Sequence, residues 1–358
     1  LSLFFSISFQ NSFLPSIFYF RYFLLSVGIY YLIIKYKFFI NFIFYSLVLT
    51  FTILLSDSLF QYFFGFNIFG YSPIYDPTPV LTSFFNDEKK LGSYIVRLLP
   101  FFLGIFYYLK KEKYMIYIFH FSGFIVFLSS ERVALFLFFI IILFTVFITK
   151  KKTKIIFGLI FIFSILFLTE QARLSKYSIY TLQQMGVLDA KWNQSNGKIR
   201  YFSKEHENLS YTALVISKDK LLTGNGIKNF HLACNLMKTK KKENNINYSF
   251  FVNRDNELAC STHPHNTYLQ ILSEIGIFGF LMILGIFIKI FILNIKIIIK
   301  KKFDNIQIGY YFANIGIIVN LIPFIPSGSF FNNWMSLILF YPLGFWLYMN
   351  STYINSTK

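Results

Sequence analysis

Cys260-Ser261-Thr262-His263-Pro264-His265-Asn266-Thr267-Tyr268-Leu269-Gln270 lies between a mixed polar segment and an apolar run that begins near Ile275. Pro264 disfavours the helical conformation at His263, so we expect the chain to arrive extended. Thr267 then reads as the N-cap of a helix and Gln270 as its capping-box partner. We expect this helix to continue into the apolar run. Two imidazoles and an amide would precede its N-terminus, where backbone N–H groups favour an anion; a polar loop at a membrane interface is the simpler interpretation.

The composition excludes an ordinary soluble domain, because 55% of the 358 residues are hydrophobic and 22% are aromatic. Crossing a bilayer takes roughly 20 apolar residues, and each span must be helical because open strands are not stable in lipid. The sequence therefore predicts an all-α polytopic membrane protein with about nine transmembrane helices. We also expect a further N-terminal part to precede Leu1, which lies in an apolar segment. The candidate spans are Leu14–Ile34, Phe38–Leu55, Ser93–Leu109, Tyr114–Ser130, Val133–Thr149, Ile155–Thr169, Ile275–Ile295, Ile306–Ile325 and Trp334–Met349.

Lysines gather in the connections on one side of these runs, which the positive-inside rule makes cytoplasmic. The opposite side holds residues 56–92, the Glu131-Arg132 turn, residues 170–274 and residues 326–333. The candidate chemistry therefore faces away from the cytoplasm, and the net charge of +18 is mainly a topology signal rather than a nucleic-acid surface. The inner lysines are Lys35, Lys37, Lys110, Lys111, Lys113, Lys150, Lys151, Lys152, Lys154, Lys296, Lys300, Lys301 and Lys302.

All the arginines map to the outer side. A guanidinium grips phosphate or carboxylate through a rigid fork of donors. Ionisable groups near or within spans are costly and are functional candidates by default. As a set these arginines favour an anion site, although any one of them could extend toward lipid headgroups. They are Arg21, Arg97, Arg132, Arg173, Arg200 and Arg254.

The long outer segment, residues 170–262, divides the chain into residues 1–169, 170–262 and 263–358. Leu209–Leu222 reads as an amphipathic helix ended by the turn Thr223-Gly224-Asn225-Gly226, and 238–247 as a solvated loop. The only two cysteines, Cys234 and Cys260, both lie in this segment. An even count on an oxidising side predicts a disulfide, with two unpaired thiols as the alternative.

Three motifs resemble the O-antigen ligase and O-antigen polymerase family of bacterial membrane glycosyltransferases. They are His-Pro-His-Asn-x-Tyr-Leu-Gln-x-Leu-x-Glu-x-Gly-x-x-Gly at 263–279, Gly-x-Gly-x-x-x-Phe from Gly224 through Gly226 to Phe230, and a weaker match at 84–93. The resemblance implies transfer of a glycan from an undecaprenyl-pyrophosphate donor to an acceptor hydroxyl, on lipid A-core or another surface glycan. It also implies a multi-pass protein of the bacterial inner membrane, a partly helical periplasmic cap from residues 170–262, and no cofactor. Ligase and polymerase share these motifs, so the acceptor stays open.

The resemblance implies that His265 occupies the most characteristic catalytic position of the family. Asn266, the next residue, belongs to the same catalytic element, and His263 is expected to be a supporting contact. A neutral imidazole can accept the acceptor's hydroxyl proton. The candidates for holding the pyrophosphate are Arg132, Arg97, Arg200, Arg254 and His206. Many relatives have an arginine where this chain has His206, so Arg200 or Arg254 is expected to substitute for it.

Two alternatives compete with a metal-independent glycosyltransferase, namely a divalent-cation site and a transporter. Asp87 and Glu88 could hold a divalent cation, but the sequence offers no third oxygen ligand, and we expect the pair to cap the helix that leads to Arg97. Intramembrane charges would also suit a transporter for lipid-linked glycans. No inverted repeat supports that class.

The Lys asymmetry predicts that residues 150–154 are cytoplasmic and that 170–262 are extracytoplasmic. In a cysteine-free background, an impermeant thiol reagent added to intact cells should label Lys240→Cys and leave Lys152→Cys unlabelled. Labelling of Lys152→Cys would overturn this topology.

Overall fold

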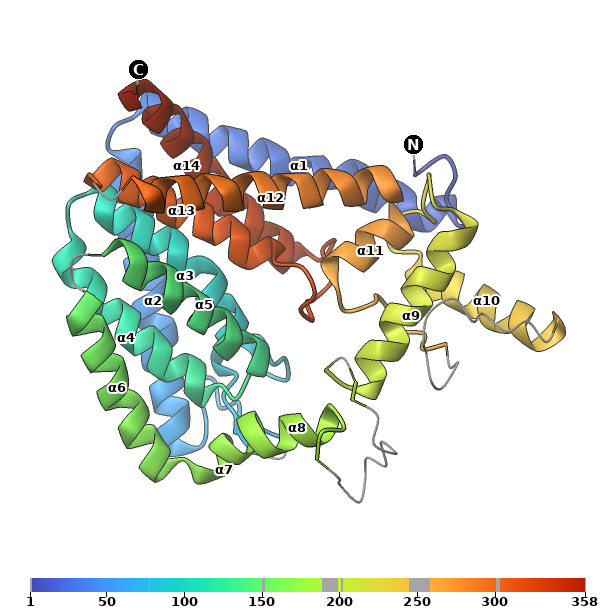
Figure 1. Cartoon of the computed structure of the whole chain (residues 1–358), viewed down its shortest axis with the longest axis horizontal. Coiled ribbons are helices and arrows are strands. Elements are labelled where there is room, and N and C mark those ends of the chain that lie inside the picture. The colour runs from blue at the N-terminus through green and yellow to red at the C-terminus, as the bar shows by residue number, and fades with distance from the viewer. Residues whose placement is uncertain are drawn as a thin grey trace. The chain divides into compact units, whose positions relative to one another are not determined.

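The computed structural model describes residues 2–76, 78–149, 152–188, 199–200, 202–244, 258–300 and 303–357, most of them helical (Figure 1). A small antiparallel pair of strands, β1 and β2, aligns Ile74 with Val80. The elements are α1 Phe9–Lys35, α2 Phe39–Phe64, β1 Ile74–Tyr75, β2 Pro79–Val80, the 3-10 turn η1 Ser83–Phe85, α3 Leu91–Tyr108, α4 Glu112–Leu128, α5 Arg132–Ile148, α6 Lys152–Thr169, α7 Gln171–Ser175, the π-helix η2 Lys176–Tyr180, α8 Thr181–Gln184, α9 Lys204–Asp219, α10 Phe230–Asn244, α11 Thr267–Glu274, α12 Ile277–Ile299, α13 Asn305–Leu321 and α14 Asn333–Thr357.

Each apolar run expected to span the membrane overlaps one helix among α1–α6 and α12–α14. Among the described residues, 4 helices are long and apolar enough to cross a bilayer, namely α1, α2, α3 and α12. The count rises to 5 if Thr153–Thr169 and Gln171–Gln184, which meet at a 100° bend, form one span. The helical class and the multi-pass membrane character are thus confirmed, and the count of about nine spans stays a prediction.

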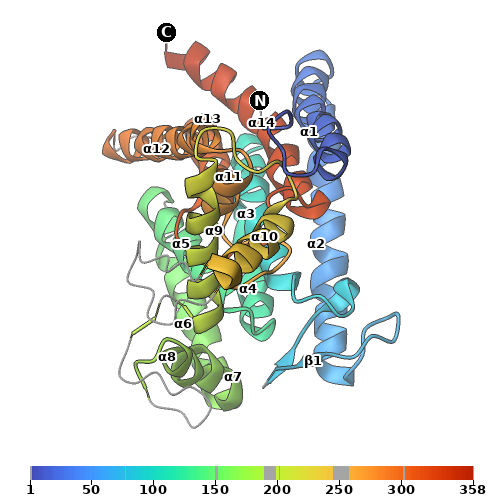
Figure 2. The same cartoon turned by 90° about the vertical axis from the view of Figure 1, so that its right-hand side faces the viewer.

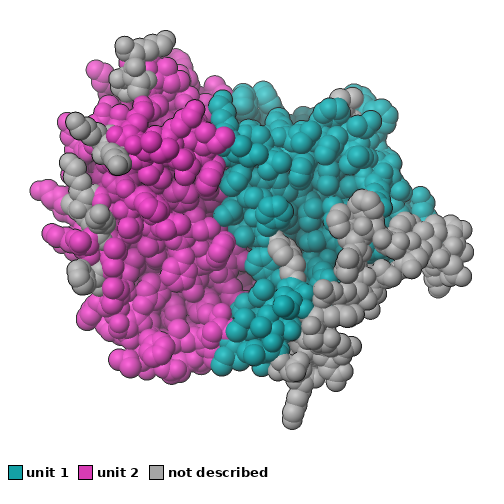
Figure 3. Space-filling view, viewed as in Figure 1, with its two compact units in different colours: residues 1–24, 179–289, 321–337 teal, residues 25–178, 290–320, 338–358 magenta. Residues whose placement is uncertain are grey.

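The described residues form two compact units, each assembled from separate parts of the chain (Figure 3). Unit 1 comprises Leu1–Leu24, Ile179–Lys289 and Leu321–Leu337, and unit 2 comprises Leu25–Ser178, Ile290–Asn320 and Ile338–Lys358. The sequence instead predicts three consecutive segments, 1–169, 170–262 and 263–358, and this division remains a prediction.

In unit 2, helix α3 packs against α2, α4 and α5 and is buried along most of its length. The carboxylate of Glu131 accepts hydrogen bonds from the backbone nitrogens of Gly92 and Ser93, at 2.6 and 3.1 Å. The N-terminus of α3 is therefore capped from the turn before α5. The expectation that Asp87 and Glu88 cap it is wrong, because α3 has no side-chain bond at its own N-cap and Glu88 pairs with Lys90.

Unit 1 contains a separate hydrophobic core under α9 and α10, which lie side by side (Figure 2). Helix α9 begins five residues before the predicted Leu209, because Ser203 caps it by accepting a hydrogen bond from the His206 nitrogen. The expectation of a loop at 238–247 is wrong for 238–244, which belong to α10, and 245–247 lie outside the described residues. Lysine is a good helix former, so a polar run can extend a helix that is anchored at its start. The core consists of Leu209, Tyr211, Ala213, Val215, Ile216, Phe230, Ala233, Cys234, Met237 and Leu258.

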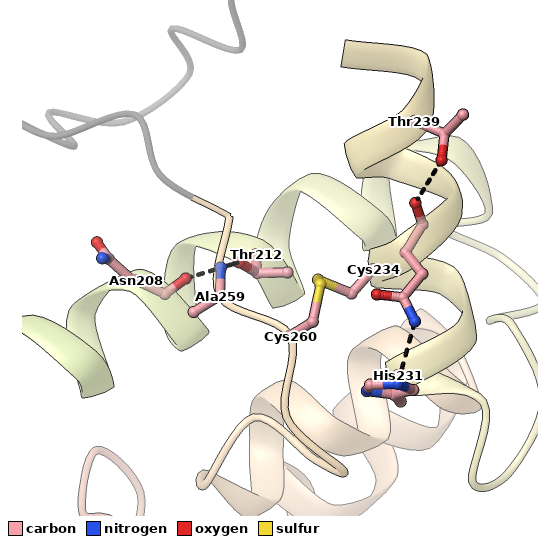
Figure 4. Close-up of a disulfide and its surroundings, with 8 residues drawn as sticks. Asn208, Thr212, His231, Cys234, Thr239, Ala259 and Cys260 are labelled. Atoms are coloured by element: carbon pink, nitrogen blue, oxygen red, sulfur yellow. Dashed lines mark hydrogen bonds between the residues drawn. A yellow bond between two sulfur atoms is a disulfide. The ribbon is translucent and has the colours of Figure 1, made fainter. Parts of the chain in front are cut away.

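The predicted disulfide is present. It joins Cys234 on α10 to Cys260, with their Cα atoms 5.5 Å apart (Figure 4). Next to it, the Ala259 nitrogen donates to the hydroxyl of Thr212 on α9 at 3.0 Å. The segment that enters the His-Pro-His-Asn motif is thereby attached to both helices of the core.

Helix α11 begins and ends differently from the prediction. Asn266, not Thr267, is its N-cap, and the Asn266 side-chain oxygen accepts from the nitrogens of Tyr268 and Leu269 at 3.0 and 3.1 Å. The helix stops at Glu274, and α12 begins only after Gly276, whose φ is +95°. The positive φ at Gly276 interrupts the helix, and glycine is needed there because a Cβ would collide with the backbone of Leu222.

The Gly-x-Gly segment runs along the C-terminal end of α11. The nitrogens of Asn225 and Gly226 donate to the carbonyls of Ser273 and Glu274, both at 2.9 Å. Gly224 has φ +67°, and a Cβ there would overlap the backbone of Glu274. Glycine is needed at this position for both its conformation and its size.

Replacing Gly224 by alanine should therefore destabilise the protein by more than about 1 kcal/mol, since alanine at a positive φ is strained even without a collision. Thermal unfolding of purified Gly224→Ala in detergent should show a clearly lower midpoint than the wild type. Gly285→Ala is the matched control, because its Cβ would meet no atom within 4 Å. Equal midpoints for the two variants would contradict the close approach.

Candidate functional site

Three imidazoles come together in unit 1. The ring centroids of His263 and His265 lie 4.1 Å apart, and those of His265 and His206 lie 6.0 Å apart. The first two belong to the turn before α11, and His206 lies in the first turn of α9. Sequence analysis predicted each residue separately, and their grouping into one histidine cluster is a result of the fold.

Local contacts set the position of His206. The Ser203 hydroxyl is 2.8 Å from its Nδ1, and the Phe202 ring lies 6.4 Å away by centroid. The next residue, Glu207, is 3.7 Å from the guanidinium of Arg200. A buried guanidinium therefore lies near the residue that follows His206.

His265 adopts a left-handed backbone conformation with φ +52°, which is uncommon for any residue other than glycine. Its carbonyl accepts a hydrogen bond from the Ser327 nitrogen at 2.8 Å. The side-chain amide of Asn266 donates to the Ile325 carbonyl at 3.3 Å while its oxygen caps α11. Both ends of this amide are thus bonded inside the protein.

Burial makes both motif imidazoles weak bases. Burial, together with the neighbouring His265, lowers the pKa of His263 from 6.5 to about 4. Burial also lowers the pKa of His265, although the negative charge of Glu205 opposes this change. Both rings are therefore neutral at pH 7, the form in which an imidazole nitrogen can accept a proton.

The polar face of α11 carries residues that sequence analysis interpreted differently or missed. Gln270, expected in a capping box, instead accepts from the Phe330 nitrogen at 2.8 Å and donates to the Ser329 hydroxyl at 2.9 Å. Glu274 is fully buried and accepts from the Phe230 nitrogen at 3.3 Å and from the Gln270 amide at 3.3 Å. Burial raises the pKa of Glu274 to about 7. Glu274 is the glutamate of the motif at 263–279, so the sequence could have pointed to this residue.

The predicted pyrophosphate ligands fall into different parts of the structure. Arg200 lies in unit 1, while Arg97 and Arg132 lie in unit 2. Arg97 is buried and donates to the Val319 carbonyl and to the Asn320 side chain, both at 3.3 Å. Arg132 is the first residue of α5, and Arg254 lies outside the described residues.

Across the part of the chain that the structure describes, no group of three or more His, Cys, Asp and Glu side chains is arranged to hold a metal ion.

The helices and the cluster define a multi-pass membrane protein with ionisable side chains grouped outside its candidate spans. Residues 117–284 match the family model described as O-antigen ligase. The match covers slightly less than half of the chain and includes α9, α11 and all three imidazoles. The match confirms, for residues 117–284, the resemblance to the O-antigen ligase family. Comparison with curated proteins and with solved structures found no match.

The lowered pKa values of His263 and His265 predict when these rings gain a proton. Both should titrate below the ordinary value of 6.5, with His263 near 4. The histidines of the unfolded chain bind protons at a higher pH than the buried rings do. The free energy of unfolding should therefore decrease as the pH falls below 6.5. NMR titration of labelled histidines, assigned with His263→Asn and His265→Asn, measures the two pKa values. A pKa at or above 6.5 for either ring would contradict the burial argument.

Proposed function

We propose that this membrane enzyme is a glycosyltransferase that moves a glycan from an undecaprenyl-pyrophosphate donor to an acceptor hydroxyl. The acceptor would be lipid A-core or another surface glycan, as in lipopolysaccharide biosynthesis, and the reaction would take place on the periplasmic face of the bacterial inner membrane. The observation that carries the proposal is the pair of neutral imidazoles in the His-Pro-His-Asn turn, inside the segment that matches the O-antigen ligase family.

In this reaction His265 acts as the general base. The acceptor hydroxyl attacks the anomeric carbon, its proton passes to the His265 ring, and the carbon–oxygen bond to the pyrophosphate breaks with the electron pair leaving on phosphate. The negative charge that develops there needs cations. Arg132, Arg97, Arg200 and Arg254 are the candidates, with His206 as a hydrogen-bond donor.

This scheme requires no metal, since guanidinium groups can stabilise the leaving pyrophosphate. Transfer by the purified protein should accordingly persist in excess EDTA.

A polymerase that extends lipid-linked repeat units is the second candidate, because the family match covers both roles in the same way. The surface-glycan pattern of a deletion strain separates them. Loss of all attached polymer indicates a ligase, and single attached repeats indicate a polymerase. A transporter, in contrast, would leave every covalent bond of the lipid-linked glycan intact in detergent.

Removing the His265 imidazole should lower transfer by about 10²–10⁴-fold, the usual contribution of general acid–base catalysis. His265→Asn is the sharper variant, because asparagine tolerates the left-handed conformation that alanine does not. His263→Asn should cost less than His265→Asn. The measurement is transfer from purified lipid-linked donor in detergent.

The control is His231→Asn, which changes an exposed histidine on α10. Near-normal transfer by a folded His265→Asn protein, together with complete loss in His263→Asn, would move the base to His263.

A further inference from the structure

The loop between α13 and α14, residues 322–332, is bonded to the His-Pro-His-Asn turn on both sides of Asn266. The Ser327 nitrogen donates to the His265 carbonyl at 2.8 Å. The Ser327 hydroxyl is 2.9 Å from the hydroxyl of Thr267, which is the first residue of α11. Ser327 thus contacts the residues immediately before and after the N-cap.

The loop is also attached farther along α11, so Ser327 does not depend on a single contact. Gln270 bonds the Phe330 nitrogen and the Ser329 hydroxyl, and the Tyr268 hydroxyl donates to the Leu321 carbonyl at 2.6 Å. Gln270 is 1% exposed, so its amide would have unmet hydrogen bonds if the loop moved away. All these residues belong to unit 1.

The conformation of His265 shows what these bonds accomplish. A left-handed backbone at a residue other than glycine persists only where its surroundings enforce it, and such residues concentrate at functional sites. Here the carbonyl of the strained residue is the group that Ser327 holds. This backbone conformation sets the direction of the Cα–Cβ bond that carries the His265 ring.

We propose that Ser327 is a positioning residue for His265. The bond between the Ser327 and Thr267 hydroxyls holds the Ser327 backbone nitrogen against the His265 carbonyl, and this contact orients His265. The inference deepens the proposed function and rests on it for the role of His265. It also extends the working site beyond residues 117–284, the segment that matches the family.

The groups that face the His265 ring are His263, His206 and Glu205. A small rotation of the turn would change its distance to all of them. Because misplacing a catalytic group slows the chemical step without removing a substrate contact, the loss should appear in kcat rather than in KM. Deleting one neutral hydrogen bond predicts a loss of about five- to tenfold.

The test compares Ser327→Ala with Ser327→Thr, which keeps a hydroxyl, and with Thr267→Val, which removes the partner hydroxyl. We expect kcat to fall about five- to tenfold in Ser327→Ala and in Thr267→Val, with KM changed less than about twofold. Ser327→Thr should restore kcat. The double variant should lose no more than either single one, because both remove the same bond.

The matched control is Ser178→Ala, an exposed serine whose hydroxyl bonds only the Leu174 carbonyl of its own turn among the contacts described. Unchanged kcat in Ser327→Ala, or a loss that Ser327→Thr does not restore, would overturn the proposal.

A measurement independent of activity separates this proposal from the proposed function. The His265 imidazole resonances should shift in Ser327→Ala and stay unchanged in Ser178→Ala. Unshifted resonances would overturn the positioning role even in an active enzyme. Shifted resonances in a protein without transferase activity would support the positioning role and reject the function.

Discussion

The rule that buried polar groups must be hydrogen-bonded governs this site, and helix α11 shows it most clearly. Glu274 and Gln270 are both buried, and each takes its partners from distant parts of the chain. Glu274 is hydrogen-bonded to the first residue of α10, and Gln270 is hydrogen-bonded to the loop before α14. A short helix of eight residues thereby becomes the part of unit 1 to which the Gly-x-Gly segment and the α13–α14 loop are both attached.

The same burial sets the chemistry of the imidazoles. Removing His263 and His265 from water disfavours their charged forms, and their mutual proximity adds to the effect on His263. A pair of neutral rings is suited to accepting a proton and unsuited to binding an anion by charge. The division of labour in the proposed reaction follows, with imidazoles for the hydroxyl and guanidinium groups for the pyrophosphate.

Unit 2 illustrates how a membrane protein accommodates charge. Arg97 is buried and Glu131 is partly buried, and both use backbone atoms or side-chain amides and hydroxyls as partners. Arg173 pairs with Glu170 and also bonds the Ser130 hydroxyl and the Pro79 carbonyl. Arg97 and Arg173 thus have structural contacts of their own, and any role in binding a substrate must be compatible with these contacts.

Local sequence was sufficient for the helices, because hydrophobic runs of about 20 residues have few alternatives in a membrane. The cysteine count was likewise sufficient to predict the disulfide, and the motif at 263–279 to predict the family match over 117–284. Short-range patterns did not reveal that Asn266 rather than Thr267 caps α11, that Gly276 ends it, or that Glu131 caps α3. Those outcomes depend on partners such as Leu222, Ile325 and Ser327, which lie tens of residues away along the chain. Residue types and their order could be read from the sequence, whereas the grouping of His206 with His263 and His265 required the tertiary structure, because only folding brings α9 beside the turn that precedes α11.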